Sequence, residues 1–276
     1  VFKDSVHDYI YVYEPLILEL IDSKEVQRLR NIKQLGVSYL TYHSAEHSRF
    51  THSLGSYEVM RRILERLKKK EELILSTEEE LLCKASALLH DIGHAPFSHS
   101  LEDVFGYRHE KWAKKIILGD SEVNRILSEF NSDFPQQVAK VIVSEHPNKL
   151  IVSLISSQID ADRMDYLLRD SQATGVSYGL FDLERIIKLM LAEDDKVLFR
   201  TEGMHSIEAY ILARYAMYWQ VYFHPTTRSA EIVLRRLLKR AKELYIKGEE
   251  IYLATALRNS LLEKATVDDY LELNDA

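Results

Sequence analysis

Apolar residues recur along most of the chain at the spacing of an amphipathic helix. The clearest case is the stretch from Leu81 to Ile92, where positions 81, 82, 85, 88, 89 and 92 are apolar. This i, i+3, i+4, i+7 spacing predicts a helix that buries one face in a core. The helix should end before Pro96, because the residue preceding a proline is disfavoured in the α conformation. The same periodicity predicts helices over 16–35 with a break near 22–23, around 60–67, over 101–105, 112–118, 121–145 with an interruption at Pro135, 151–170, 183–191, 205–224 and 229–247.

Two segments instead alternate β-branched or aromatic residues with polar ones. Residues 3–13 do so before Glu14-Pro15, and residues 196–201 form the second such segment. Alternation of this kind is typical of strands. Only 9 glycines and 5 prolines occur among 276 residues, which is little material for a fold with many tight turns. We therefore predict an all-α, mainly helical fold with two short β-strand or hairpin pieces.

The composition limits the classes of partner. The net charge of -7 argues against non-specific coating of nucleic acid, although a local basic pocket remains compatible with it. Cys83 is the single cysteine, so no internal disulfide can form, and a reducing cytoplasm is the expected compartment. No apolar run is long enough to span a bilayer, and no signal-peptide pattern is present. We expect a cytoplasmic protein without membrane contact or strong nucleic-acid binding.

Candidate chemistry gathers at the end of the helix predicted over 81–92. There His90 and Asp91 stand side by side, and burying an ionised carboxylate at such a place requires a counter-charge. Taken singly, His52 is more often a structural residue and Asp162 part of a solvated acidic face. Together the four side chains predict a metal site with mixed His and Asp ligands. Such ligands suit Mn, Fe or Zn, while Mg remains possible although it prefers more oxygen donors.

These residues also carry a family resemblance. His52, His90-Asp91 and the distant Asp162 resemble the H…HD…D signature of the HD-domain metal-dependent phosphohydrolases. The resemblance is closer to one branch, the deoxynucleoside triphosphate triphosphohydrolases, which includes dGTPases and the vertebrate SAM-and-HD-domain enzyme. It is carried by QRLRNIKQLG at 27–36, HSRFTHSLG at 47–55, LLHDIGHAPFSH at 88–99 and IDADRMDY at 159–166, and it covers roughly residues 1–225.

The resemblance implies roles for individual residues. One divalent ion would be held by His52, His90, Asp91 and Asp162. His99 with Glu102 would form the acid–base pair, and His94 and His109 would contact phosphate close to the reacting atoms. Gln34 and Leu35 would select the deoxyribose. The other residues implied in substrate binding are Arg49, Arg163, Tyr166, Asp170, Arg214 and Tyr222.

A second nucleotide site is a weaker implication. Asp22, Gln27 and Arg30 fall where the vertebrate relative binds an activating guanine nucleotide. The same residues are equally well interpreted as a capping Asp and two helix-surface side chains. Nucleotide activation is therefore one of two open interpretations of this segment.

The resemblance implies one HD domain over 1–276. Its helical metal core would cover about 16–175, and a C-terminal helical lobe would cover about 176–276. This lobe is shorter than in the family, so the chain is a possible truncation. The implied reaction converts a dNTP to a deoxynucleoside and inorganic triphosphate. A deoxyribonucleoside 5′-monophosphatase, another nucleotide phosphohydrolase and a non-catalytic nucleotide-binding regulator are the alternatives. A homo-oligomer, dimer or tetramer, is expected. Base preference, native metal, activator and oligomeric state stay open.

Overall fold

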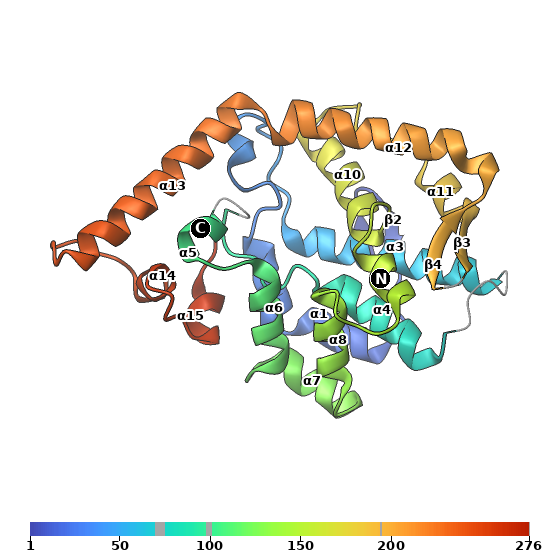
Figure 1. Cartoon of the computed structure of the whole chain (residues 1–276), viewed down its shortest axis with the longest axis horizontal. Coiled ribbons are helices and arrows are strands. Elements are labelled where there is room, and N and C mark those ends of the chain that lie inside the picture. Colours follow the sequence, from blue (N-terminus) through green and yellow to red (C-terminus); the bar gives the residue numbers. More distant parts are fainter. Residues whose placement is uncertain (70–74, 98–100, 194, 276) are drawn as a thin grey trace.

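The computed structural model describes residues 1–69, 75–97, 101–193 and 195–275, and in these ranges the chain is mainly helical (Figure 1). The α-helices are α1 Pro15–Asp22, α2 Lys24–Arg28, α3 Arg49–Lys69, α4 Thr77–Leu89, α5 Glu102–Phe105, α6 His109–Leu118, α7 Glu122–Phe130, α8 Phe134–Ile142, α9 Lys149–Ile155, α10 Ala161–Thr174, α11 Leu183–Leu189, α12 Met204–Met217, α13 Pro225–Ile246, α14 Thr255–Leu261 and α15 Val267–Glu272. Short 3-10 helices occur at Leu29–Asn31, Gly36–Leu40 and Thr201–Gly203, and a π turn covers Tyr218–Tyr222. The predicted fold class is confirmed.

Both predicted β pieces are antiparallel hairpins. Strand β1 (Phe2–Asp4) pairs with β2 (Asp8–Ile10). Strand β4 (Lys196–Phe199) pairs with β3 (Met190–Glu193), a segment whose start we had assigned to the helix over 183–191. That helix ends at Leu189, because the residues after it pair with β4.

Other helix boundaries also differ from the prediction. The helix predicted over 151–170 is two helices, because Asp160 caps α10 by accepting hydrogen bonds from the backbone N–H groups of Ser157 and Arg163, both at 2.7 Å. Pro135 lies in the first turn of α8, where proline is tolerated, so it helps to begin that helix. The helix predicted up to residue 35 ends earlier, at Arg28, and continues as a 3-10 turn.

The core is organised around α3, which packs against α4 on one side and α10 on the other. Leu88 and Leu89 of α4 and Tyr57 of α3 have no exposed surface. Burying side chains of this size contributes roughly 1.5–3 kcal/mol each. These three helices are therefore held firmly, and it is they that carry the four candidate metal ligands.

The C-terminal part forms an arm that returns to the body of the molecule. Helix α13 runs away from the core, and α14 and α15 lead back toward α5 and α6 (Figure 1). Tyr270 of α15 stacks on Trp112 of α6, with ring centroids 3.9 Å apart. The Tyr270 hydroxyl donates to the carbonyl of Gly93 at 2.6 Å. Helix α15 therefore supports the turn that follows His90 and Asp91.

Residues 273–275 continue from this arm to the wall of the main pocket. Arg28 donates to the carbonyl of Leu273 at 3.0 Å. The Asp275 carboxylate accepts from two backbone N–H groups that are far apart in sequence, those of Lys33 at 2.5 Å and Phe97 at 2.7 Å. A single side chain thus ties together the segments that lead into and out of the pocket wall.

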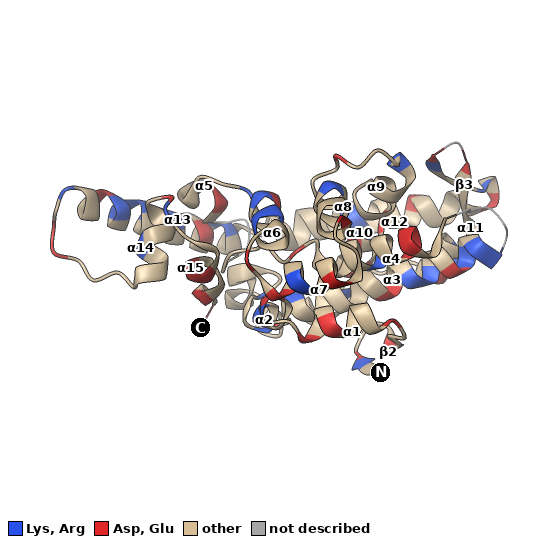
Figure 2. Cartoon of the chain, turned by 90° about the horizontal axis from the view of Figure 1, so that it is seen from below, with Lys and Arg blue, Asp and Glu red and all other residues tan. Residues whose placement is uncertain are grey.

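Charged side chains of both signs are interspersed along the helices (Figure 2). Within the residues that the structure describes, no helix combines the length and apolar character that crossing a membrane requires.

Candidate metal centre and adjoining pocket

Three helices deliver the predicted ligands to one place. The first turn of α3 carries His52, and the first turn of α10 carries Asp162. His90 is the C-cap of α4, and Asp91 follows it in the turn beyond that helix. Helix α4 is fixed at its other end by a capping box between Ser76 and Glu79. The ligand positions are therefore set by helix ends that are packed in the core.

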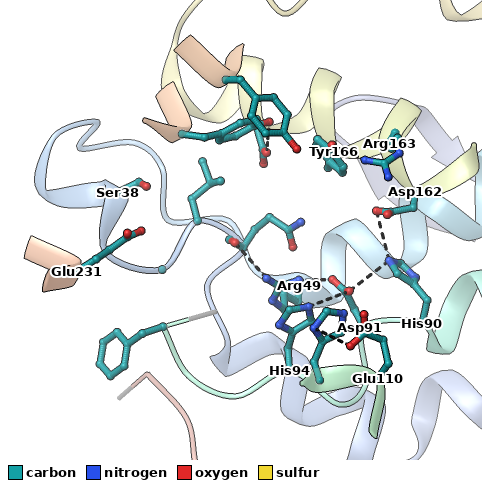
Figure 3. A pocket seen from close by; sticks show the side chains of 18 of the residues that line it. Ser38, Arg49, His90, Asp91, His94, Glu110, Asp162, Arg163, Tyr166 and Glu231 are labelled. Carbon is teal, nitrogen blue, oxygen red and sulfur yellow. Dashed lines mark hydrogen bonds and ion pairs between the residues drawn. The ribbon is translucent and has the colours of Figure 1, made fainter. Parts of the chain in front are cut away.

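The four side chains converge closely, and Figure 3 shows three of them, His90, Asp91 and Asp162. The Nε2 atoms of His52 and His90 are 3.2 Å apart. An Asp162 oxygen lies 3.1 Å from His52 Nε2 and 3.4 Å from His90 Nε2. Asp91 oxygens lie 3.8 and 3.4 Å from the same two nitrogens. Two nitrogen and several oxygen donors thus surround one point, which is the donor set of a site for a divalent transition metal.

The charges of the cluster favour a cation. Burial alone would raise the pKa of the Asp91 carboxyl, but the Arg49 guanidinium and the neighbouring imidazoles hold it well below its usual range. Burial would lower the pKa of His52, yet Asp162 and Asp165 outweigh burial and raise it to about 10. The carboxylates therefore hold protons on the imidazoles, and a divalent cation would displace those protons on binding. The residues present fit a metal ion.

A buried ionic network lies behind His52. Asp165 accepts from His52 Nδ1 and from His7 Nε2, both at 2.7 Å. It also accepts two hydrogen bonds from Arg169, both at 2.9 Å, and Arg169 is paired in turn with Asp4. With its Nδ1 proton held by Asp165, His52 presents the lone pair of Nε2 to a metal. The N-terminal hairpin, which carries Asp4 and His7, is thereby tied to a metal ligand.

Gly55 makes this network possible. A Cβ at this position would overlap the Asp165 carboxylate and the Arg169 guanidinium. We expect Gly55→Ala to lower the free energy of unfolding by about 1–3 kcal/mol, because the network has no room to move. Urea denaturation checks this, with Gly203→Ala as the control. A Cβ at Gly203 would first meet the flexible Leu189 side chain at 3.0 Å, so the free energy of unfolding should fall less in this control. Equal losses in the two variants would contradict the expectation.

A second group of possible ligands adjoins the first. Asp91, His94 and His109 have donor atoms within 4.8 Å of one another. The rings of His94 and His109 stack at 3.9 Å, and burial together with Arg49 and His109 lowers the pKa of His94 well below its usual value. His109 Nδ1 lies 2.7 Å from Glu102. The predicted partner of Glu102, His99, lies outside the described residues, so that pairing stays a prediction.

A cavity of about 640 Å³ opens from the metal ligands. The predicted residues that line it are Gln34, Leu35, Arg49, His90, Asp91, His94, His109, Asp162, Arg163, Tyr166, Asp170 and Tyr222. Asp170 is held on both oxygens, by Tyr222 at 2.8 Å and by His47 at 2.7 Å. The carbonyl of His47 also accepts from the backbone of Gln34 at 3.0 Å. His47 therefore fixes the two polar residues at this part of the cavity.

Other predicted residues lie elsewhere. Arg214 does not line the cavity and donates to Gln158 at 2.7 Å instead. Gln27 donates to the carbonyl of Ile21 and accepts from Arg30, both at 2.7 Å. Asp22 is exposed at the end of α1. These three residues thus lie on a helix surface with local hydrogen bonds, and the activator site stays a prediction.

Sequence reasoning missed several residues of the site. Asp165 lay within the quoted motif, three positions after Asp162, and that spacing could have identified it. His7 offered no signal, because its contact with Asp165 joins positions 158 residues apart. Arg228 and Glu231 also line the cavity. The helix predicted over 229–247 contains Glu231 but begins one residue after Arg228, and its periodicity indicates no functional role for either.

The sequence of this chain is similar to two family models and to several known proteins. The HD domain model matches residues 49–170, and the HD associated region model matches residues 181–260. The chain is 54% identical to the uncharacterized protein YwfO of Bacillus subtilis, over 100% of this chain and 64% of that protein. It is 30% identical to a deoxynucleoside triphosphate triphosphohydrolase SAMHD1 homolog of Dictyostelium discoideum, over 85% of this chain and 48% of that protein.

A solved structure is similar over nearly the whole chain. A phosphohydrolase from Bacteroides thetaiotaomicron superposes with a TM-score of 0.89 at 35% identity, covering 99% of this chain and 69% of that one. The chain thus spans less than two thirds of the YwfO relative and somewhat more of the solved structure.

Proposed function

The chain belongs to the HD-domain phosphohydrolase family, and from this we propose that it hydrolyses deoxynucleoside triphosphates to deoxynucleoside and inorganic triphosphate at one divalent metal ion. The observation that supports this most is that one cavity is lined by metal ligands, by cationic side chains and by the group Gln34, Leu35 and Asp170. These are the kinds of side chain that would bind the phosphates and the sugar of a nucleotide.

The metal ion, of the Mn, Fe or Zn type, would supply a Lewis acid and activate water for attack on the α-phosphorus. Arg49 and Arg163 both line the cavity and would neutralise charge on the polyphosphate as it develops. Arg49 is held in place by its ion pair with Asp91. The number of cationic groups beyond the ligands favours a triphosphate over a monophosphate.

His109 is the described histidine best placed to handle a proton. Glu102 accepts from its Nδ1, which orients the ring. His94 stacks against it and, with its pKa lowered, would stay neutral and accept a hydrogen bond. His99 remains the second candidate for this role from the family resemblance.

Deoxyribose selection would rest on Gln34, Leu35 and Asp170. The bulky Leu35 side chain would exclude a 2′-hydroxyl, while the polar pair would bind the 3′-hydroxyl. A site built to pair a hydroxyl rejects analogues strongly, because its own buried polar groups are otherwise left unpaired.

Phosphorus NMR of the Mn-loaded protein with each dNTP, with and without GTP, tests the proposal. We expect inorganic triphosphate as the phosphorus product, and none after the metal is removed with a chelator. Orthophosphate or pyrophosphate would indicate a different phosphohydrolase. Binding without any product would favour a nucleotide-binding regulator. A requirement for GTP would revive the activator interpretation of Asp22, Gln27 and Arg30.

A further inference from the structure

Beyond the groups assigned to phosphate and sugar, the cavity continues to α13. Glu231 and Arg228 from the first turns of this helix line it, together with Phe223. In Figure 3, Glu231 and Ser38 lie on the side of the pocket away from His90 and Asp162. If the phosphates sit at the metal ligands and the sugar at Leu35, the base is directed toward α13. This step rests on the proposed function.

The fold holds Glu231 in this position. Helix α13 packs on the 3-10 helix Gly36–Leu40, which carries Ser38 and follows Leu35 directly. The hydroxyls of Thr227 and Thr41 hydrogen bond at 3.1 Å across this contact, and Thr227 is buried. The start of α13, which carries Glu231, is therefore fixed against the cavity wall.

The Glu231 carboxylate is only partly engaged. Arg228 donates to its Oε2, and no group in the described part of the chain donates to Oε1. An i, i+3 pair of this kind is usually a surface feature of little energetic consequence. Glu231, however, has a side-chain exposure of 14%, whereas Glu243 in the similar pair with Arg240 on the same helix is 60% exposed. Glu231 is set into a cavity, where a carboxylate with a free oxygen requires a donor.

We propose that Glu231 and Arg228 read the Watson–Crick edge of a guanine base, which makes dGTP the preferred substrate. Guanine presents, in order, the acceptor O6, the donor N1–H and the donor N2–H. A carboxylate accepts from the two adjacent donors while the neighbouring guanidinium donates to O6.

The other bases match this pair less well. Adenine offers one donor followed by the lone pair of N1, which would face the carboxylate and repel it. Cytosine offers one donor followed by two acceptors, and thymine offers a single donor between two acceptors. Only guanine places two donors side by side. Leu35 and Phe223, which line the same region, supply apolar walls for the ring.

Relative kcat/KM values for dGTP, dITP and dATP test the inference. Hypoxanthine differs from guanine only by lacking the N2 amino group, so dITP removes one donor without altering the protein. We expect the wild-type chain to favour dGTP over dITP, and more so over dATP, by about tenfold or more. In Glu231→Gln the amide NH₂ opposes a base donor, so this advantage should disappear.

Glu243→Gln is the matched control, since it alters the same kind of ion pair on the same helix away from the cavity. It should retain the full preference for dGTP. Equal use of the nucleotides, a preference for dATP, or a dGTP advantage that survives Glu231→Gln would overturn the inference while leaving the triphosphohydrolase proposal intact.

Absence of turnover would contradict the proposed function instead. Equilibrium dialysis of dGTP and dATP against the metal-loaded protein then decides the inference separately. Preferential retention of dGTP that Glu231→Gln abolishes would support it, and equal retention of the two nucleotides would overturn it.

Discussion

Replacing Asp162 with alanine is expected to abolish release of triphosphate and to weaken divalent-metal binding by more than about 100-fold. Loss of an outer hydrogen-bond partner of a metal ligand already costs about 10- to 100-fold. Asp162 contributes an oxygen within 3.1 Å of His52 Nε2 and 3.4 Å of His90 Nε2, so its loss removes a donor outright. Isothermal titration calorimetry with Mn measures the affinity, and phosphorus NMR measures the product.

The fold should survive this change. The Asp162 side chain is 29% exposed, the most accessible of the four candidate ligands. Burial, and then the charge of Asp162, raises the pKa of Asp160 to about 7, so removing Asp162 also removes a repulsion. Glu208→Ala is the control, because Glu208 forms an exposed pair with His205 on α12. Metal affinity in Asp162→Ala equal to that of this control would exclude Asp162 as a ligand.

The second large effect concerns Asp165. Asp165→Asn is expected to lower the free energy of unfolding by about 3–5 kcal/mol, because it leaves the buried Arg169 guanidinium without one of its two charge partners. The same change removes the carboxylate charge and replaces one of the two oxygens that accept from His52, His7 and Arg169 with an NH₂ donor. The orientation of His52 is therefore weakened, and metal affinity should also fall by about 10- to 100-fold. Urea denaturation of the metal-free chain and calorimetry with Mn measure the two effects separately.

The exposed pair of the N-terminal hairpin provides the control for this variant. Asp8 pairs with Lys3, and its side chain is 72% exposed. Asp8→Asn should change stability by less than about 0.5 kcal/mol. If Asp165→Asn were as stable as Asp8→Asn, the buried network would contribute nothing net to the fold.

Low pH should reduce the stability that the network around Asp165 contributes. Burial alone would raise the pKa of Asp165, but Arg169 and then the hydrogen bonds from His52 and His7 hold it well below its usual range. A carboxyl with a lowered folded-state pKa stabilises the protein fully above its unfolded value of about 3.9. That contribution is lost as the pH falls through the folded pKa. The difference between wild type and Asp165→Asn should therefore stay constant near neutrality and shrink below about pH 4.

Rules that depend only on neighbouring residues explain why most helices, and the candidate ligands at their ends, could be predicted from the sequence. The ligands His52, His90, Asp91 and Asp162 stand at helix ends, where periodicity and the Pro96 boundary are informative. The errors arose at caps and pairings that periodicity does not report. Asp160 ends one helix and begins another through two backbone hydrogen bonds, and β3 forms only because β4 is beside it.

Contacts between residues far apart in the sequence could not be predicted, for a different reason. The metal ligands matched a known pattern and so could be assembled from separate motifs. His7 and Glu231 belong to no such pattern, and their positions depend on packing across the whole chain. Arg214 shows the converse, since the family resemblance implied a role in substrate binding, whereas its side chain donates to Gln158 and does not line the cavity.

The Asp275 contact bears on the order in which the molecule assembles. All four metal ligands lie between residues 52 and 162, so they can come together once the first two thirds of the chain have left the ribosome. The wall at Lys33 and Phe97 is joined by Asp275, across sequence separations of 242 and 178 residues. Contacts of such separation form late, because the loop must close before they stabilise anything. A nascent chain would thus bring its candidate metal ligands together before the wall of the adjoining cavity is closed.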